Sequence, residues 1–157
     1  MRVKLYLDTS VLGAVSDPGP EDRTVATRRL LDGVIGGRWE GFISTVVLLE
    51  IDRAAEPIRR KIGEELVRLP LTTLEETAET IELAQSYVRA GAIPADAEND
   101  ARHIAIAAFN DIRVVVSWNF RHMVNIERKR KINSVNLREA LPLLDIVSPW
   151  EVGDEEA

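Results

Sequence analysis

The sequence predicts an α/β domain with a mainly parallel sheet of short strands. Short apolar runs alternate along the chain with longer segments of helical periodicity, and this alternation is typical of parallel strands joined by helices. The length of 157 residues suits one domain. Because we find no internal repeat and no interior linker, we expect one domain over residues 1–150. An acidic tail at 151–157 should follow it and be disordered.

In the first half of the chain, strand and helix signals follow one another closely. Asp8 to Ser10 reads as a turn or a helix cap after the first strand. Residues 17–20 form a loop of proline and glycine, and Gly36 with Gly37 stops a helix. The segments expected are a strand at Val3–Leu7, a helix at Glu21–Ile35, a strand at Phe42–Ile43, a helix from Ser44 or Thr45 through Glu50, a helix at Pro57–Leu69 and a short strand at Pro70–Leu74.

The second half continues the same alternation. Its most strand-like stretch is Arg113 to Ser117, a run of β-branched residues. Apolar residues at helical spacing mark the helix before it. The segments expected are a helix at Thr77–Ala90, a helix at Pro94–Asn110, the strand at Arg113–Ser117, a helix at Asn119–Arg130 and a last strand at Ile146–Val147.

Composition excludes several classes of site. The chain has no cysteine, so disulfides, cysteine-based zinc sites and thiol nucleophiles are excluded. It has 2 histidines, so a three-histidine metal site is excluded as well. No apolar run approaches the roughly 20 residues of a membrane span, and the N-terminus lacks signal-peptide architecture. We therefore expect a soluble, cytoplasmic protein.

The charge balance is acidic, with 26 acids against 20 bases and a net charge of −6. Proteins that coat nucleic acid by bulk charge usually have the opposite balance. The distribution is uneven, however: the tail from Glu151 to Ala157 is acidic, whereas the segment from Arg121 to Lys131 is strongly basic. The position of the acids is therefore more informative than their sum.

Several acids fall where open α/β sheets keep their sites. Asp8 directly follows the first strand and Asn119 follows the Arg113–Ser117 strand, so both belong to the carboxyl edge of the sheet. Glu50 lies on the helix after the second strand, and Asp96 and Asp100 share one face of a predicted helix. Each acid alone has an ordinary alternative as a cap or a solvated residue. Carboxylates that converge without cysteine suit hard cations such as Mg²⁺ or Mn²⁺.

Four stretches carry a more specific pattern. They are Leu5–Ser10, Ile43–Ile51, Asp100–Ala107 and Val116–His122. In this order they resemble the PIN-domain family of metal-dependent ribonucleases, which includes the VapC-type toxins of toxin–antitoxin systems. The stretch Ile132–Asn136 resembles one branch of that family.

The resemblance implies a three-layer α/β/α sandwich in which Asp8, Glu50 and Asp100 gather around one or two ions of Mg²⁺ or Mn²⁺. The implied reaction is hydrolysis of an RNA phosphodiester by metal-activated water. Physical chemistry agrees, because the ion can activate water and offset charge on the phosphoryl group. The implied partners are an RNA substrate, a small antitoxin protein and a second copy of the chain in a homodimer.

The chain departs from the common family pattern at Asn119, a position where many members carry aspartate. We expect Asn119 to lie in the catalytic cleft, but asparagine offers a carbonyl oxygen without the charge, which weakens the case for a second metal. Asp96 or Glu98 could compensate, although each is equally plausible as a solvated helix-start residue. The departure leaves open an alternative function, a catalytically weak or inactive scaffold that binds RNA or a protein. Phosphatase or DNA nuclease chemistry is a weaker alternative.

Further side chains are candidates for contact with RNA, each with a structural alternative as a cap or a surface residue. They are Thr9, Ser10, Arg121, His122, Arg128 and Lys129. Basic groups beside an acidic cleft can hold the RNA backbone. We expect His103 to be a partly buried structural histidine and Trp118 to be a packing residue. The sequence shows no stacked aromatics and no base-reading module.

Overall fold

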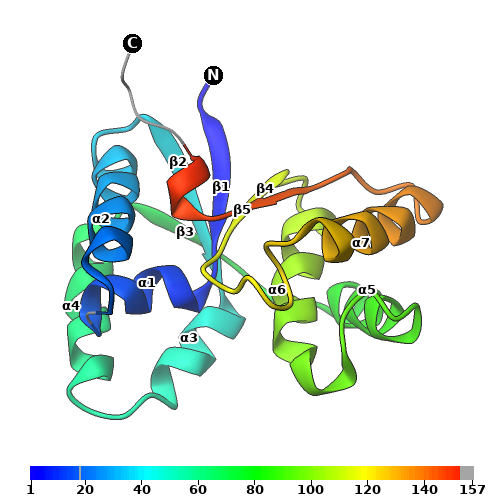
Figure 1. Cartoon of the computed structure of the whole chain (residues 1–157), viewed down its shortest axis with the longest axis horizontal. Helices are drawn as coiled ribbons and strands as arrows, with labels where there is room; N and C mark the ends of the chain where they lie inside the picture. Colours follow the sequence, from blue (N-terminus) through cyan, green and yellow to red (C-terminus); the bar gives the residue numbers. More distant parts are fainter. Residues whose placement is uncertain (18, 153–157) are drawn as a thin grey trace.

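The strand at Val3–Leu7 (β1) forms the centre of a parallel sheet. The protein was analysed as a computed structural model, which describes residues 1–17 and 19–152. Within these residues the sheet has 5 strands in the order β3-β2-β1-β4-β5, all parallel (Figure 1). The remaining strands are β2 (Trp39–Ser44), β3 (Leu71–Leu74), β4 (Val114–Val116) and β5 (Asp145–Val147).

Helices cover both faces of this sheet, which gives the predicted three-layer sandwich (Figure 1). On one side lie α1 (Thr9–Ser16), α2 (Glu21–Ile35) and α4 (Ile58–Arg68). On the other side lie α5 (Ala78–Arg89), α6 (Glu98–Phe109) and α7 (Ile126–Arg138). The helix α3 (Thr45–Asp52) lies at the lower edge in Figure 1, and it contacts α6 and α4. Short 3₁₀ helices occur at η1 (Ala95–Ala97) and η2 (Pro149–Glu151).

The core explains why the central strands read as continuous apolar runs. Leu5, Tyr6 and Leu7 of β1 are essentially inaccessible to solvent, as are Val115 and Val116 of β4. A parallel sheet covered by helices on both faces buries the middle of its central strands, so alternation with polar residues is absent there, whereas Val3 and Lys4 at the start of β1 are exposed. The apolar runs thus place β1 and β4 side by side at the centre of the sheet.

Two predicted helices have different boundaries in the structure. The helix expected at Asn119–Arg130 is wrong in its first part, because residues 119–124 form turns and α7 begins at Ile126 and extends to Arg138. The Asn125 side chain caps α7 by accepting a hydrogen bond from the Arg128 N–H at 2.9 Å. The helix expected at Pro94–Asn110 is divided into η1 and α6.

The helix α1 begins where the sequence predicts only a turn or a cap, at Asp8 to Ser10. At the other end, Glu151 belongs to η2, where its carboxylate accepts from the Ser148 N–H at 3.0 Å. The rest of the predicted acidic tail, residues 153–157, lies outside the described residues, as does residue 18 of the loop before α2. Among the described helices, none is both long and apolar enough to cross a membrane.

Candidate active site

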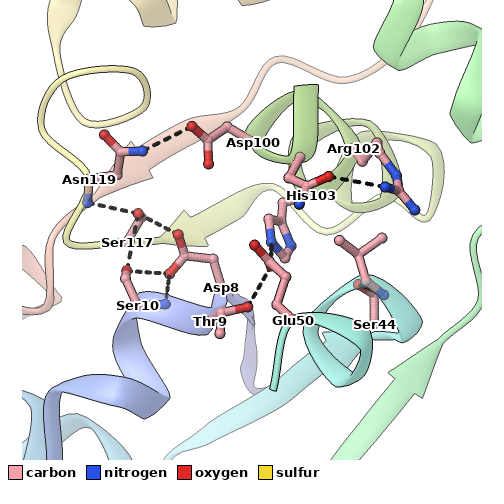
Figure 2. Close-up of polar contacts among 12 residues, drawn as sticks. Asp8, Thr9, Ser10, Ser44, Glu50, Asp100, Arg102, His103, Ser117 and Asn119 are labelled. Atoms are coloured by element: carbon pink, nitrogen blue, oxygen red, sulfur yellow. Dashed lines mark hydrogen bonds and ion pairs between the residues drawn. The ribbon is translucent and has the colours of Figure 1, made fainter. Parts of the chain in front are cut away.

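The predicted acids meet at the carboxyl edge of the sheet (Figure 2). Asp8 ends β1 and caps α1, because its Oδ1 accepts from the Ser10 N–H at 3.1 Å. Glu50 projects from α3, which begins directly after β2. Asp100 lies in the first turn of α6, and Asn119 follows β4. Each of these positions is set by a strand or helix that ends or begins at the same edge, as parallel topology requires.

Asp8 is a buried carboxylate held by hydroxyl groups. Only 4% of the residue is exposed. Ser10 Oγ donates to its Oδ1 at 2.6 Å, and Ser117 Oγ donates to its Oδ2 at 2.6 Å. Burial raises the pKa of Asp8, and the nearby charge of Asp100 raises it further, although His103 and the two serine hydroxyls act in the opposite direction. A cation near Asp8 would relieve this cost.

Glu50 differs from Asp8 because its hydrogen bonds lower its pKa by more than its burial raises it. Thr9 Oγ1 donates to Glu50 Oε1 at 2.7 Å, and His103 Nε2 lies 2.5 Å from the same oxygen. Burial by itself would raise the pKa of Glu50, but the contacts with His103 and Thr9 lower it overall. The pKa of Glu50 thus lies below its usual value, and two donors fix the position of its carboxylate.

Behind Glu50 lies a buried chain of hydrogen bonds that the sequence did not reveal. Tyr6 OH lies 2.7 Å from Ser44 Oγ and 2.6 Å from His103 Nδ1. His103 therefore joins Glu50 through Nε2 to the Tyr6 hydroxyl through Nδ1. Burial raises the pKa of Tyr6, which keeps this hydroxyl protonated. The chain of hydrogen bonds fixes the orientation of the His103 ring and of Glu50.

No local signal identified Tyr6 and Ser44 as parts of this chain. In the sequence Tyr6 is one more apolar-strand residue, and Ser44 is one more helix cap. The bond between them joins neighbouring strands, and the bond to His103 spans 97 positions of the chain. The prediction that His103 is a structural histidine gave its burial correctly, since 2% of the residue is exposed, but did not give its link to Glu50.

Asp100 and Asn119 form the opposite side of the site. Asn119 Nδ2 donates to Asp100 Oδ2 at 3.0 Å, and His122 Nδ1 lies 3.4 Å from that oxygen. Burial raises the pKa of Asp100 and the charge of Glu50 adds to this, against the effect of His103 and His122. The side-chain oxygen of Asn119, Oδ1, accepts hydrogen bonds from the backbone N–H groups of Arg121 and His122 at 3.1 and 2.9 Å. Asn119 thus stabilises a turn and donates to an acid.

Ser117 is a third residue, after Tyr6 and Ser44, that sequence reasoning missed. It is fully buried, donates to Asp8 and accepts from the Asn119 N–H at 2.9 Å. It therefore joins the two sides of the site. The only signal in the sequence was its place at the end of a predicted strand, next to residues already considered.

The predicted RNA-binding residues are divided by the structure. Thr9, Ser10 and His122 contact the acids, as described above, and Arg121 is exposed on the adjoining turn. Arg128 instead donates to the Ala92 carbonyl at 3.1 Å, and Lys129 pairs with Asp145 at 3.5 Å. These two basic residues tie α7 to neighbouring segments and do not contact the acids.

Asp96 and Glu98 lie close to Asp100 at the surface. Together with His122 they line one hollow of about 420 Å³. Both acids are exposed. They add negative charge to the hollow beside Asp100.

The donor set has the chemistry of a hard-cation site, because it consists of carboxylate oxygens with hydroxyl and amide groups around them. Within the described part of the chain, however, no three acidic or histidine side chains are grouped closely enough to hold a metal ion as they stand. The carboxylate oxygens are directed to hydroxyl, imidazole and amide donors instead.

Comparison with known proteins agrees with this fold. A structure of VapBC2 from Rickettsia felis, bound to a DNA fragment from the promoter, is 16% identical with a TM-score of 0.59, and the alignment covers 93% of this chain and 98% of that one. VapC20 of Mycobacterium tuberculosis, a toxin that cleaves the sarcin–ricin loop, is 17% identical with a TM-score of 0.56, over 75% and 92% of the two chains. At these identities the likeness establishes the fold.

Sequence comparison goes further. No curated protein matches the chain significantly. The family description "PIN domain" matches residues 5–129, which is most of the chain and includes Asp8, Glu50, Asp100 and Asn119. By this match, and with a fold shared with VapC toxins, the chain belongs to the PIN-domain family.

Proposed function

We propose that this protein is a metal-dependent ribonuclease that hydrolyses RNA phosphodiester bonds. Asp8, Glu50 and Asp100 would hold Mg²⁺ or Mn²⁺, with Asn119 assisting beside them. One observation carries the proposal: the carboxylates of Asp8, Glu50 and Asp100 come from three separate elements to the carboxyl edge, where burial raises the pKa of Asp8 and of Asp100, the charge of Asp100 raises that of Asp8 further, and the charge of Glu50 raises that of Asp100 further. Such mutual repulsion is tolerated where a cation is to be bound.

The surrounding residues have defined tasks in this proposal. Ser10 and Ser117 orient the two oxygens of Asp8, while Thr9 and His103 orient Glu50. Such second contacts keep ligands in position and tune their basicity. A bound divalent ion would supply an activated water and offset charge on the phosphoryl oxygens.

We further propose a role as the toxin of a toxin–antitoxin pair in the cytoplasm, with a small antitoxin as partner and a homodimer as the assembly. The support is the shared fold with VapBC2 and VapC20. Co-expression with a short neighbouring reading frame should yield a stable complex in which RNA cleavage is suppressed. Light scattering of the protein alone should give twice the mass of one chain.

The ribonuclease proposal is tested with purified protein and a mixed RNA substrate. Cleavage should require Mg²⁺ or Mn²⁺ and stop with EDTA. Asp8→Asn and Asp100→Asn should each lower the rate by at least about a hundredfold, because each removes a charged ligand. Asp52→Asn, a change at an exposed carboxylate at the end of α3, is the matched control and should cleave at the wild-type rate. Cleavage by Asp8→Asn at the wild-type rate contradicts the proposal.

A second candidate function is a scaffold that binds RNA or protein without cutting. The engagement of Asn119 favours it, since the carbonyl oxygen accepts two backbone N–H groups and the amide donates to Asp100. The Asn119 amide thus binds Asp100 Oδ2, one of the carboxylate oxygens that a metal ion would need as a ligand. Calorimetric titration separates the two functions: no Mn²⁺ binding at millimolar concentration, together with retained RNA binding, supports the scaffold.

A further inference from the structure

Four side chains far apart in the sequence form one cluster beside the acids. Arg23 comes from α2, Trp118 and Phe120 follow β4, and Trp150 belongs to η2. The Cζ atom of Arg23 lies 5.1 Å from the ring centroid of Trp118, 5.4 Å from that of Phe120 and 5.7 Å from that of Trp150. We call these four residues the aromatic cluster. It corrects the sequence-based view that the chain offers no stacked aromatics.

The aromatic cluster has a fixed base and an exposed outer part. Trp118 is buried, and its indole N–H donates to Thr27 Oγ1 at 2.9 Å. Trp150 packs edge-on against Trp118, with ring centroids 4.7 Å apart. Phe120 and Trp150 are nearly parallel, at 23° and 6.0 Å, and they remain 37% and 47% exposed. Two aromatic rings thus present surface to solvent in a set orientation.

In the segment that follows β4, successive side chains contact the acids and the aromatic cluster in turn. Ser117 and Asn119 contact Asp8 and Asp100, whereas Trp118 and Phe120, the residues in between, enter the aromatic cluster. The Trp118 N–H also donates to Ser10 Oγ at 2.9 Å, and Ser10 in turn donates to Asp8. One short segment therefore positions both features at once.

A cavity links the two features from the other side. It has a volume of about 380 Å³, and its lining includes Thr9 and Ser10 from the acid site as well as Arg23 and Trp118 from the aromatic cluster. Ligand pockets commonly measure about 300–1,000 Å³. Arg23 thus lines the cavity and also lies over the rings of the aromatic cluster.

We propose that the aromatic cluster stacks an unpaired nucleobase of an RNA strand whose phosphodiester lies at the acids. This proposal rests on the proposed ribonuclease function. Every base has a π face that stacks on exposed aromatic rings without regard to sequence. In a chain with a net charge of −6, Arg23 also supplies a local positive charge for the adjoining phosphate. An RNA strand offers both a base for the exposed rings and a phosphate for Arg23, and the cluster therefore fits RNA better than it fits an apolar protein surface.

Binding to a short single-stranded oligoribonucleotide tests the proposal. A dye-labelled five-residue oligoadenylate and an abasic strand of the same length are titrated in EDTA, so that cleavage does not intervene. Trp150→Ala and Phe120→Ala should each weaken oligoadenylate binding about five- to tenfold, the lower part of the range for one stacked base. Binding of the abasic strand should be unchanged, and Trp150→Phe should retain most of the affinity.

Phe109→Ala is the matched control, because Phe109 is an aromatic residue at the end of α6 that is 47% exposed, as Trp150 is. It should bind both strands as the wild type does. Thermal unfolding of each variant confirms that it is folded, and Phe120→Ala carries the test if Trp150→Ala unfolds. Equal affinity of wild type and both alanine variants, or equal loss for the base-containing and abasic strands, overturns the proposal, and then a protein partner is the occupant to examine.

Cleavage measured on the same proteins separates this proposal from the one on which it rests. If base-dependent binding is lost in Trp150→Ala while the wild type fails to cleave with Mn²⁺, stacking is supported and the ribonuclease function is contradicted. If the wild type cleaves and Trp150→Ala cleaves oligoadenylate with the same kcat/KM, the ribonuclease function is supported and stacking is overturned.

Discussion

Single residues at the carboxyl edge combine a structural and a chemical task. Asp8 caps α1 through its Oδ1 and is also the most deeply buried acid of the site. A cap at the surface keeps its charge at little cost, whereas Asp8 is a carboxylate removed from water. The residue is therefore better suited to receive a cation than to maximise stability.

The first prediction follows from that cost. Replacing Asp8 with asparagine, in the absence of metal, should raise the melting temperature at pH 7, because the variant buries no charge. The exposed Asp52→Asn change should leave the melting temperature within the error of measurement. An unchanged or lower melting temperature for Asp8→Asn at pH 7 would show that the serine hydroxyls fully offset the burial of Asp8.

The pH dependence of this effect has a definite sign. The folded state raises the pKa of Asp8, so it holds the proton more tightly than the unfolded chain, whose aspartate pKa is about 4. The free energy of unfolding of the wild type therefore falls, relative to Asp8→Asn, as the pH rises from about 4 through the folded-state pKa. Below that window the two proteins should converge. Melting curves between pH 3.5 and 8 measure the difference.

A second residue-scale prediction concerns the buried chain behind Glu50. Tyr6→Phe removes a hydroxyl shared by Ser44 and His103: His103 Nδ1 loses its partner, and Ser44 Oγ keeps only the Val46 N–H that it caps. The expected loss in the free energy of unfolding is about 1–3 kcal/mol, the usual cost of an unpaired buried polar group. Ser44→Ala alone should also lower the free energy of unfolding, because it removes the cap of α3, but the double variant should lose less than the sum of the two single losses, since the Tyr6–Ser44 bond is then counted once. Urea unfolding of the single and double variants measures this, and strictly additive losses would contradict the hydrogen-bond account.

At the scale of elements, the late start of α7 decides what the turn after β4 can do. The turn of residues 119–124 carries Asn119, Phe120 and His122, and Asn125 closes it. Asn125 Nδ2 donates to the carbonyls of Phe120 and Arg121, both at 2.9 Å, while its Oδ1 caps α7.

Asn125 therefore supports two contacts that substitution can separate. Asn125→Ala should lower the free energy of unfolding by about 1 kcal/mol through loss of the cap. Asn125→Asp keeps the cap acceptor but loses both Nδ2–H donors, so it should retain most of the stability and still loosen the turn. Denaturant unfolding reports the first effect, and hydrogen exchange at Phe120 and Arg121 reports the second. Equal loss of stability in both variants would contradict the cap.

The contact between α2 and α4 gives a prediction about ion pairs. Arg28 pairs with both oxygens of Glu65, at 2.6 and 3.3 Å, and Glu65 is buried. Arg28→Met should cost about 1–2 kcal/mol, less than the loss of a fully buried pair, because Arg28 is partly exposed and Arg68 also reaches Glu65. The control is Arg60→Met, which breaks an exposed pair with Glu64 and should cost under about 0.5 kcal/mol. Similar losses in urea unfolding would contradict this difference.

Most elements could be predicted from the sequence, and the exceptions have local causes. The β1 and β4 runs, the glycine stop after α2 and the proline before α4 are signals within a few residues. By contrast, Asn119 and Asn125 are both good helix caps, and only packing of the intervening turn against the acids decides that α7 starts at the second. Such a choice depends on contacts with Asp100 that no local pattern contains.

At the scale of the whole molecule, metal should act as a stabilising ligand. Saturating Mn²⁺ at about a hundred times its Kd would add roughly 2.7 kcal/mol to the free energy of unfolding, provided that the unfolded chain does not bind it. The melting temperature of the wild type should therefore rise with added Mn²⁺, whereas that of Asp100→Asn should rise much less. Asp52→Asn, the exposed control, should respond as the wild type does. An equal response in all three proteins would place any metal elsewhere.

The candidate site was predictable to the extent that it follows strand ends. Asp8, Glu50 and Asn119 could be placed at one edge, because parallel strands end together. The buried chain of Tyr6 and Ser44 and the aromatic cluster of Arg23 and Trp150 could not, since each depends on residues that only the folded packing brings together. Arg128 and Lys129 show the converse: closeness in sequence to Asn119 did not place their charges at the acids.

The central position of β1 also sets an order of events during synthesis. β1 is the first element made, yet one of its two neighbours is β4, whose pairing residues begin at position 114. At about 5–20 residues per second, roughly 5–20 s separate the synthesis of Asp8 from that of Ser117. Throughout this interval the nascent chain carries Asp8 without the strand that completes its surroundings. Any catalysis at this edge can therefore begin only after β4 and Ser117 have been made.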